Sequence, residues 1–325
     1  MKNPLIAKAL NRILRQIDKF KIHRQKLSLP EMSEAERFLA DEFRAKIGEL
    51  NIPDSQGMSP AEKAWNDNMH TLQRMVESRD PRAFLSWDVV AGTMFVKYAK
   101  YSRTEYGYLR SLADWPRWKE VLREDNAGLP ARCPFDTSTS CNLVHHAYHV
   151  AQFEKFSNET VSNFDYVLEF GGGYGSMCRL FFKLGFKGRY LIVDLPAFSA
   201  LQEYFLKSVG IRVLTKDEFI KGESGVLCAS DIDELDDLIG GRKSLFLATW
   251  SISESPLFVR EKILGKYSNA FDAYLVAFQP KFEDVDNAVF FEKLRADHPD
   301  YSWVTEDMAH LKKQKYLFGR KSFSN

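Results

Sequence analysis

The stretch FDYVLEFGGGYGSMCRLFFKLGFKGRYLIVDLP, residues 164 to 196, decides how the rest of the chain is interpreted. It opens with a short apolar run, Tyr166 to Phe170, which is rich in strand-forming residues and is closed by three consecutive glycines. Apolar residues then recur at helical spacing from Met177 to Leu184, and further glycines end that helix before a second apolar run, Tyr190 to Val193. The stretch therefore predicts a strand, a tight glycine turn, a crossover helix and a second strand.

The glycines of the turn alternate, because Gly171, Gly173 and Gly175 are separated by single residues. A backbone without side chains at these positions can pass close to a ligand and open a helix whose free amides face it. Two acids flank the turn: Glu169 lies two residues before the first glycine, and Asp194 ends the second strand. In a doubly wound sheet an acid at that second position accepts hydrogen bonds from ribose hydroxyls. The pattern therefore predicts a site for an adenosyl-type cofactor.

A nicotinamide-dependent enzyme is the competing interpretation of the glycine turn. Its fingerprint requires Gly or Ala where this chain has Ser176, and it does not ask for an acid before the glycines. A turn that merely joins two strands is the other alternative, and it leaves both flanking acids without a reason.

The pattern Glu169-x-Gly171-x-Gly173-x-Gly175, followed by Val193-Asp194-Leu195-Pro196, resembles the cofactor site of class I S-adenosylmethionine-dependent methyltransferases. The wider segments HHAYHVAQFE at residues 145 to 154, VLEFGGGYGSMCRL and VDLPAFSALQEYFLKS are similar to the bacterial sugar O-methyltransferases. The close match covers about a third of the chain. The resemblance implies S-adenosyl-L-methionine as the cofactor, with Glu169 at its methionine amino group, Asp194 at its ribose and Leu195 against its adenine.

The whole chain has the composition of an ordinary globular protein of 325 residues with a formal net charge of +1. This charge balance gives no case for a nucleic-acid partner. The four cysteines form no CxxC pair or metal-ligand cluster, which suits a reducing cytoplasm. No apolar run is long enough to cross a bilayer, and the start shows no signal-peptide pattern. We therefore expect a cytoplasmic protein.

The first 26 residues are amphipathic and basic, with eight Lys and Arg against one Asp, a local charge of +7. A helix of this kind can pack on its own domain or on the partner in a homodimer. The alternative is a peripheral contact with anionic lipid at the inner face of the membrane.

Helical patterns continue to about residue 111, with Ser33-x-x-Glu36 and Ser59-x-x-Glu62 as capping boxes. Residues 124 to 134 form the predicted linker, so we expect an all-α N-terminal cap domain (1–130) and a methyltransferase domain (131–325). The expected fold is α/β, a Rossmann-like, mostly parallel, doubly wound sheet, and the resemblance implies seven strands with an antiparallel hairpin at one edge. Beyond the first two, strands are predicted at 211–214, 244–249, 273–278, 303–305 and 316–319, and a further apolar run lies at 225–229.

The segment LVHHAYHVAQFEKF predicts a helix in which His145 and His149, four residues apart, share a face. Two histidines at that spacing can bind a metal, but no third ligand and no zincin glutamate is evident, so we expect no metal. The two histidines are either core residues bonded to backbone carbonyls or catalytic. In the catalytic interpretation, one of them removes the proton from a sugar hydroxyl, because the usual pKa of His suits a base near neutral pH.

The ends of later strands supply three further candidates. Asp231 follows the apolar run 225–229, and the resemblance implies a contact with the adenine amine, which this class often makes with a polar residue after its third strand. The acidic run that begins at Asp231 suits a solvated helix start better than a magnesium site. Trp250 follows the fourth strand and resembles a tryptophan of plant small-molecule O-methyltransferases, so we assign it to the cofactor site. Those enzymes carry a His-Asp pair three residues on, where this chain has Ser253 and Glu254. Glu254 is therefore a third candidate base, an orienting group for a histidine, or a helix cap.

The expected activity is methyl transfer from S-adenosylmethionine to a hydroxyl, and the resemblance places that hydroxyl on a sugar or glycan acceptor in polysaccharide biosynthesis at the cell surface. Two alternatives remain: a methyltransferase for a small phenol or amine, and a noncatalytic adenosyl-binding partner protein.

Overall fold

The computed structural model describes residues 29–97, 100–240 and 243–322. The chain divides into two compact units, one made of the residues up to Glu49 with Thr71–His149, the other of Leu50–His70 with the chain from Val150 onward. The predicted basic helix of residues 1–26 lies outside the described residues. The boundary predicted at residue 130 concerns independent folding and stays a prediction.

The first unit is mostly helical. Its elements are α2 (Glu34–Gly48), the end of α3 (Pro60–Ser78), η1 (Pro81–Ser86), α4 (Asp88–Thr93), α5 (Lys100–Ser111), α6 (Trp115–Val121), the antiparallel pair β1 (Arg132–Cys133) and β2 (Asp136–Ser140), and the start of α7 (Cys141–Ser157). The buried side chains of α2 are Ala40, Phe43 and Ile47, which recur every three or four residues, as the helical period requires.

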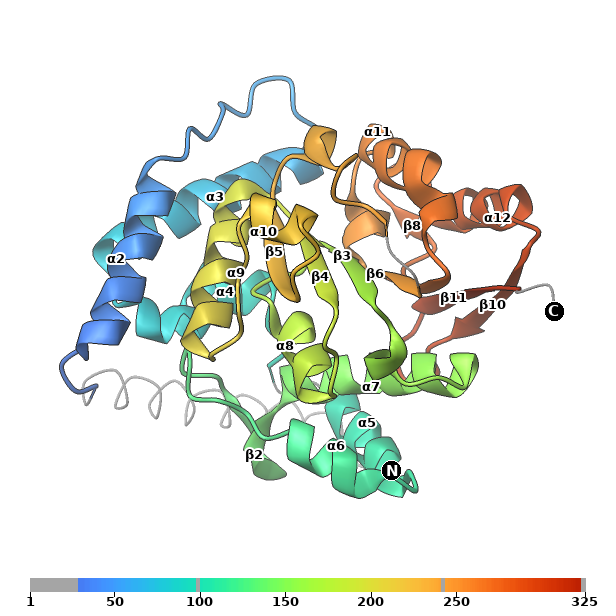
Figure 1. Ribbon diagram of the computed structural model, residues 1–325, viewed down its shortest axis with the longest axis horizontal. Helices are drawn as coiled ribbons and strands as arrows, with labels where there is room; N and C mark the ends of the chain where they lie inside the picture. The colour runs from blue at the N-terminus through green and yellow to red at the C-terminus, as the bar shows by residue number, and fades with distance from the viewer. Residues whose placement is uncertain (1–28, 98–99, 241–242, 323–325) are drawn as a thin grey trace, which may run out of the picture. The chain divides into compact units, whose positions relative to one another are not determined.

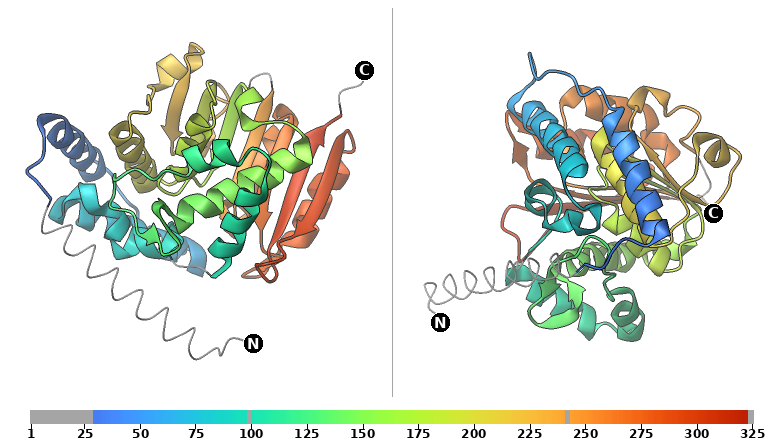
Figure 2. Two further views of the ribbon diagram at one scale, coloured as in Figure 1. Left: turned by 90° about the horizontal axis from the view of Figure 1, so that it is seen from below. Right: turned by 90° about the vertical axis from the view of Figure 1, so that its left-hand side faces the viewer.

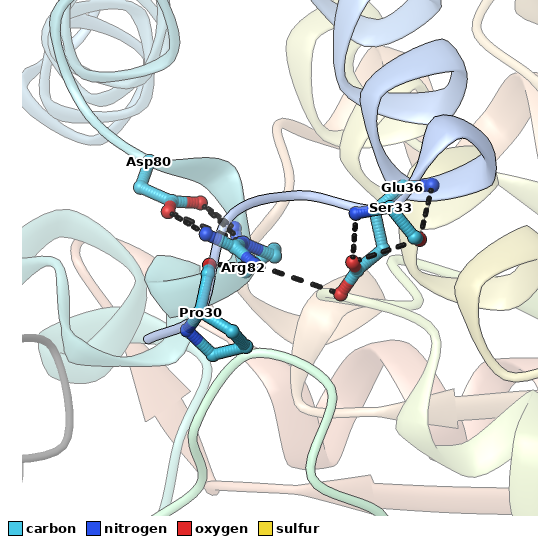
Figure 3. A network of polar contacts seen from close by, with 5 residues as sticks. All are labelled: Pro30, Ser33, Glu36, Asp80 and Arg82. Carbon is cyan, nitrogen blue, oxygen red and sulfur yellow. Dashed lines mark hydrogen bonds and ion pairs between the residues drawn. The ribbon is translucent and has the colours of Figure 1, made fainter. Parts of the chain in front are cut away.

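A polar network fixes the start of α2 (Figure 3). The Ser33 hydroxyl accepts from the Glu36 backbone amide at 3.3 Å, and the Glu36 carboxylate accepts from the Ser33 amide at 2.8 Å, so the predicted capping box is confirmed. The Arg82 guanidinium lies 2.8 Å from Asp80 Oδ2 and 3.8 Å from Glu36 Oε1, and it donates to the Pro30 carbonyl at 3.0 Å. Arg82 therefore links the cap of α2 to the beginning of η1.

The second unit is built on a seven-stranded sheet in the order β10-β11-β7-β6-β3-β4-β5. Five neighbouring strands, from β7 to β5, are parallel, and β11 and β10 are antiparallel additions at one edge, coloured red in Figures 1 and 2. This is the mostly parallel, Rossmann-like sheet that the sequence predicts. Its strands are β3 (Tyr166–Phe170), β4 (Arg189–Val193), β5 (Gly225–Ala229), β6 (Ser244–Thr249), β7 (Ala273–Phe278), β10 (Tyr301–Asp307) and β11 (Lys315–Lys321).

Helices and short turns connect these strands. They are η2 (Val161–Asn163), α8 (Ser176–Lys183), α9 (Pro196–Ser208), α10 (Lys216–Ile220), η3 (Ile232–Glu234), η4 (Ser251–Glu254), α11 (Leu257–Arg260), the π-helical η5 (Glu261–Gly265), η6 (Ser268–Ala270), the hairpin β8 (Lys281–Phe282) and β9 (Val285–Asp286), and α12 (Asn287–Asp297).

The strand predicted at residues 211–214 is wrong. Only Val213 makes a bridge, to Val226, and the third parallel strand is the apolar run Gly225–Ala229. Leu214 donates its amide to the Val226 carbonyl at 2.7 Å and Val226 donates to the Arg212 carbonyl at 2.9 Å, after which the chain turns into α10. A run of four residues, three of them apolar, is too short to distinguish a strand from an extended connection.

The two faces of the sheet are covered differently. Alternate strand residues such as Leu168, Phe246 and Val276 belong to one apolar core with Phe291 and Leu294 of α12. On the opposite face, the Tyr190 ring of β4 packs against Phe181 of α8 at 5.5 Å, and Phe318 of β11 packs against Phe156 near the end of α7 at 5.2 Å. Both faces are therefore buried, as parallel sheets require.

The chain leaves β3 for β4 on one side, while β6 pairs with β3 on the other, so the strand order reverses at β3. In open α/β sheets, ligands bind beyond the carboxyl ends of the strands at this switch point. Among the described residues, no helix has the length and apolar character that a membrane crossing demands.

Candidate functional site

The glycine turn after β3 lies at the switch point. Gly171, Gly173 and Gly175 all have positive φ, from 58° to 93°, and Gly175 precedes α8. A side chain at Gly172 would bring its Cβ to 2.6 Å from Ile192 Cγ2, and one at Gly171 would collide with Ser251. The turn therefore needs glycine both for its backbone conformation and for its close approach to β4 and to the end of β6.

Glu169 lies in the middle of the sheet, on a strand whose five residues are all buried. Its side chain is on the face that carries α8, where the Tyr190 hydroxyl donates to Glu169 Oε2 at 2.8 Å. The pKa of Glu169 is raised to about 8, mainly by burial; the hydrogen bond from Tyr190 lowers it, and the nearby charge of Asp194 adds to the rise. An ionised carboxylate here is costly unless a cation meets it.

Asp194 follows β4, and its carboxylate faces the glycine turn. Oδ1 accepts from the Leu195 amide and Oδ2 from Gln202 Nε2, both at 2.8 Å, and the same Gln202 nitrogen donates to the Gly173 carbonyl at 3.0 Å. Burial raises the pKa of Asp194 to about 7, while the Leu195 amide, Gln202 and the Gly173 and Gly172 amides lower it. Gln202 of α9 thus ties the second acid to the turn. Leu195 lies beside it with 36% of its surface exposed.

The end of β6 closes the other side of the turn. Trp250 has φ of +66°, a strained conformation for a bulky residue, and its indole nitrogen donates to Gln314 Oε1. Ser251 Oγ donates to the carbonyl of Phe170, the last residue of β3, and packs against Gly171. Strain of this kind persists where the surroundings fix it, and it gathers at functional sites.

Glu254 lies two turns beyond the strand end and is partly buried. Gln279 Nε2 donates to Glu254 Oε1 at 3.3 Å, and burial raises the pKa of the carboxyl group. The segment around it is held by the fully buried Arg260, which donates to the carbonyl oxygens of Ser253 at 2.7 Å and Ser255 at 2.8 Å. The Glu254 carboxyl group is therefore held in place, and its role as a base stays a prediction.

The two predicted histidines lie together in the helical unit. His145 Nδ1 is 2.7 Å from Glu105 Oε1, and His145 Nε2 is 3.1 Å from His149 Nε2. All three side chains are buried. His145 thus meets a carboxylate of α5, and the three groups form a continuous hydrogen-bonded chain that can hold and move a proton.

Asp231 lies two residues beyond the end of β5. It is exposed after β5, and its Oδ1 accepts from the Asp233 amide at 2.8 Å, which caps the short helix η3. Its predicted adenine contact stays a prediction. No group of three or more His, Cys, Asp or Glu side chains that could hold a metal ion occurs in the part of the chain that the structure describes.

The predicted cofactor residues Glu169, Asp194 and Leu195 come together around the turn. Three residues that the sequence analysis missed support the candidate groups: Tyr190 beside Glu169, Gln202 beside Asp194, and Glu105 beside His145. Tyr190 could have been found from strand register, because Val167 pairs with Tyr190 and Glu169 is the diagonal neighbour on the same face. Glu105 carries no sequence signal, since it lies 40 residues before His145 and no local spacing links the two.

The residues present fit an adenosyl ligand that carries a positively charged amine. Glu169 is a buried acid and suits the amine, because a cation would balance its charge. Asp194 is an acid oriented by amides and suits vicinal ribose hydroxyls, and the exposed apolar side chain of Leu195 suits a flat base. The glycine turn leaves room for main-chain contact between the two acids.

The strand order and the turn define a Rossmann-like, mostly parallel α/β fold. No model of a known protein family matches the sequence, and neither does any curated protein. Among solved structures, the chain is similar to magnesium protoporphyrin IX methyltransferase from Synechocystis PCC 6803 with bound SAM (13% identity, 70% of this chain and 100% of that one, TM-score 0.38). It is also similar to an O-methyltransferase family protein from Burkholderia thailandensis (14% identity, 96% of this chain and 99% of that one, TM-score 0.37). A third similar structure is PigF with SAH (14% identity, 89% of this chain and 95% of that one, TM-score 0.36). These likenesses are distant, and the fold assignment comes from the strand order of this chain.

Proposed function

We propose that the protein is an S-adenosylmethionine-dependent O-methyltransferase whose acceptor is a sugar hydroxyl. The assignment of S-adenosylmethionine as the methyl donor is supported by one observation: Glu169 and Asp194 converge on a three-glycine turn at the switch point of the sheet. In this proposal Glu169 binds the amine of the donor, Asp194 binds its ribose hydroxyls, and Leu195 packs on its adenine. Trp250 and Asp231 complete the predicted cofactor site.

The donor, when bound, supplies a methyl group on a positively charged sulfur. The protein's part is to hold the donor, align the acceptor and accept the proton of the hydroxyl. We assign proton removal to the Glu105–His145–His149 chain, in which the carboxylate of Glu105 fixes the orientation of the His145 imidazole. Glu254 is the alternative base, since its raised pKa also suits proton transfer.

The sugar acceptor is supported by the resemblance of residues 145–154 and of the two segments around the turn to the bacterial sugar O-methyltransferases. A surface glycan or its precursor is the acceptor class we propose, in the cytoplasm. A homodimer and a peripheral membrane contact through residues 1–26 are further proposals, and both concern residues outside those described.

The test is formation of S-adenosylhomocysteine from S-adenosylmethionine with three acceptor panels: sugars and glycan extracts, phenols, and amines. We expect product with the sugar panel and a methylated sugar by mass spectrometry. Turnover with only phenols or amines would replace the acceptor class while keeping the reaction. Donor binding without turnover on any panel would indicate a noncatalytic adenosyl-binding protein, and absence of donor binding would overturn the proposal as a whole.

A further inference from the structure

The Tyr190 hydroxyl is held rigidly against the first acid of the donor site. The Tyr190 side chain is fully buried, and its ring is packed edge-on by Phe181 at 5.5 Å and Phe186 at 5.9 Å. Since the ring cannot swing away without opening this cluster, the hydroxyl stays 2.8 Å from Glu169 Oε2. One carboxyl oxygen of Glu169 is therefore committed to the protein.

The groups that act on the charge of Glu169 are Tyr190, Asp194 at the end of β4, and Cys178 on α8. Each of them is neutral or anionic. A phenol stabilises a carboxylate by a hydrogen bond but does not balance its charge, and the second acid opposes ionisation. The carboxyl group thus keeps its proton in the free protein and gives it up when a cation arrives.

We propose that Tyr190 is a positioning residue for donor binding, which holds Glu169 for the ammonium group of the donor, and that binding of this ammonium releases one proton from Glu169. The proposal rests on the proposed function and deepens it. The balance is simple: the O–H bond of Glu169 breaks, its proton passes to the buffer, and the carboxylate meets the ligand ammonium while Tyr190 keeps donating to Oε2. The adenosyl half of the ligand takes no part in this exchange.

Two ligands distinguish the roles of the amino-acid half and the adenosyl half of the donor. S-adenosylhomocysteine carries the amino-acid group, whereas 5′-methylthioadenosine has the same nucleoside without it. Calorimetric titration of the full chain with each ligand, from about pH 6 to about pH 8.5 and in buffers of different ionisation enthalpy, measures affinity and proton release together. For the wild type, we expect S-adenosylhomocysteine to bind more tightly as the pH rises and to release more protons at neutral pH than 5′-methylthioadenosine, whose pH dependence comes only from Asp194 at the ribose. Proton release from Glu169 is measured in every variant as the excess of S-adenosylhomocysteine over 5′-methylthioadenosine.

In Tyr190→Phe the ring packing is kept and the hydrogen bond is lost. Because that bond lowers the pKa of Glu169, the rise in affinity for S-adenosylhomocysteine should move to higher pH, and affinity near pH 7 should fall roughly fivefold to tenfold. Binding of 5′-methylthioadenosine should stay unchanged. Equal weakening of both ligands, or an unshifted pH profile, overturns the proposal.

Glu169→Gln provides a second route if Tyr190→Phe does not fold. This variant should lose the proton release and most of the pH dependence for S-adenosylhomocysteine while it still binds 5′-methylthioadenosine. Persistent proton release in Glu169→Gln overturns the inference, as does a wild type that binds S-adenosylhomocysteine without proton release. If the wild type binds neither ligand, the proposed function itself fails.

Discussion

Two buried carboxyl groups, one in each compact unit, are held by different kinds of partner. Glu169 in the sheet accepts from the Tyr190 phenol at 2.8 Å, and Glu105 in the helical unit lies 2.7 Å from the His145 imidazole. A phenol cannot become a cation at any pH, whereas an imidazole can. Glu169 and Glu105 have the same kind of side chain, but their hydrogen-bond partners differ in whether they can carry a positive charge.

The difference shows where each site expects its positive charge. Among the described residues, the groups that act on the charge of Glu169 include no cation, so our proposal gives Glu169 the role of binding a cationic ligand. Glu105 has a potential cation as its neighbour, and His145 Nε2 lies 3.1 Å from His149 Nε2, so our proposal gives this chain the role of proton transfer. Variants of the two regions should therefore separate into those that affect affinity and those that affect turnover.

The largest expected effect comes from the histidine chain. Replacing the histidine that acts as the base by Ala should lower kcat by roughly 100-fold to 10,000-fold, because an unassisted hydroxyl is a poor nucleophile. The affinity for S-adenosylhomocysteine should survive, since Glu169 and Asp194 are untouched. Single-turnover rates and calorimetry on His145→Ala and His149→Ala provide the measurement.

Glu105→Gln is the matched control for the histidines, because it keeps the shape and an acceptor oxygen but removes the negative charge beside His145. Its kcat should fall less than that of the histidine variants, again with donor affinity intact. Wild-type turnover in both single histidine variants would remove this region from catalysis and transfer the role of the base to Glu254.

The second effect is on affinity. Glu169→Ala removes the acid that meets the donor ammonium, and it should weaken S-adenosylhomocysteine binding by roughly 30-fold to 1,000-fold, the range expected for one partner of a buried charge pair. Calorimetry with 5′-methylthioadenosine should show little change. Comparable losses for both ligands would mean that the turn, rather than the carboxylate, had been damaged.

The same residue predicts a pH dependence of stability in the free protein. The folded-state pKa of Glu169 is about 8, above its ordinary value of 4.5, so the unfolded chain ionises first as the pH rises. The contribution of Glu169 to the free energy of unfolding is therefore fully present below the unfolded-state pKa of 4.5. It is lost as the pH rises through the folded-state pKa of about 8. Chemical unfolding of Glu169→Gln at about pH 5 and about pH 8 should show a smaller decrease than the wild type.

The elements that the sequence predicted correctly are those whose signal is local. The glycine turn is determined by φ values that only glycine adopts easily, and the strands beside it are short apolar runs with clear stops. The interpretation fails at residues 211–214, where an equally apolar run makes only one bridge because the chain turns into α10. Whether such a run becomes a strand depends on the length of paired backbone, which the sequence does not show.

The residues that support both sites were missed for a related reason, although the strand register offered a route to Tyr190. Tyr190 meets Glu169 only through the register of β3 on β4, and Gln202 meets Asp194 only through the packing of α9. Glu105 reaches His145 from a helix 40 residues earlier. The local pattern thus identifies the acids and histidines, while the groups that determine their protonation come from tertiary structure.

A smaller effect on affinity should distinguish the two acids of the donor site. Gln202→Leu removes the hydrogen bonds to Asp194 and to the Gly173 carbonyl at similar side-chain volume. Since Asp194 is assigned to the ribose, S-adenosylhomocysteine and 5′-methylthioadenosine should both weaken, by roughly fivefold to tenfold. Ser208→Ala at the far end of the same helix is the control and should bind both ligands normally. A loss confined to S-adenosylhomocysteine would contradict the assignment of Asp194.

The smallest effect is confined to the helical unit. Ser33→Ala removes the hydroxyl that caps α2 and should lower the free energy of unfolding by about 1 kcal/mol in urea denaturation. Ser33→Asp retains a capping oxygen and is the matched control. Because the five residues drawn around Ser33 in Figure 3 all belong to the helical unit, donor affinity should equal that of the wild type in both variants. A fall in donor affinity in Ser33→Ala alone would show that the helical unit and the donor site are energetically coupled. Donor binding and proton transfer could then not be treated as independent.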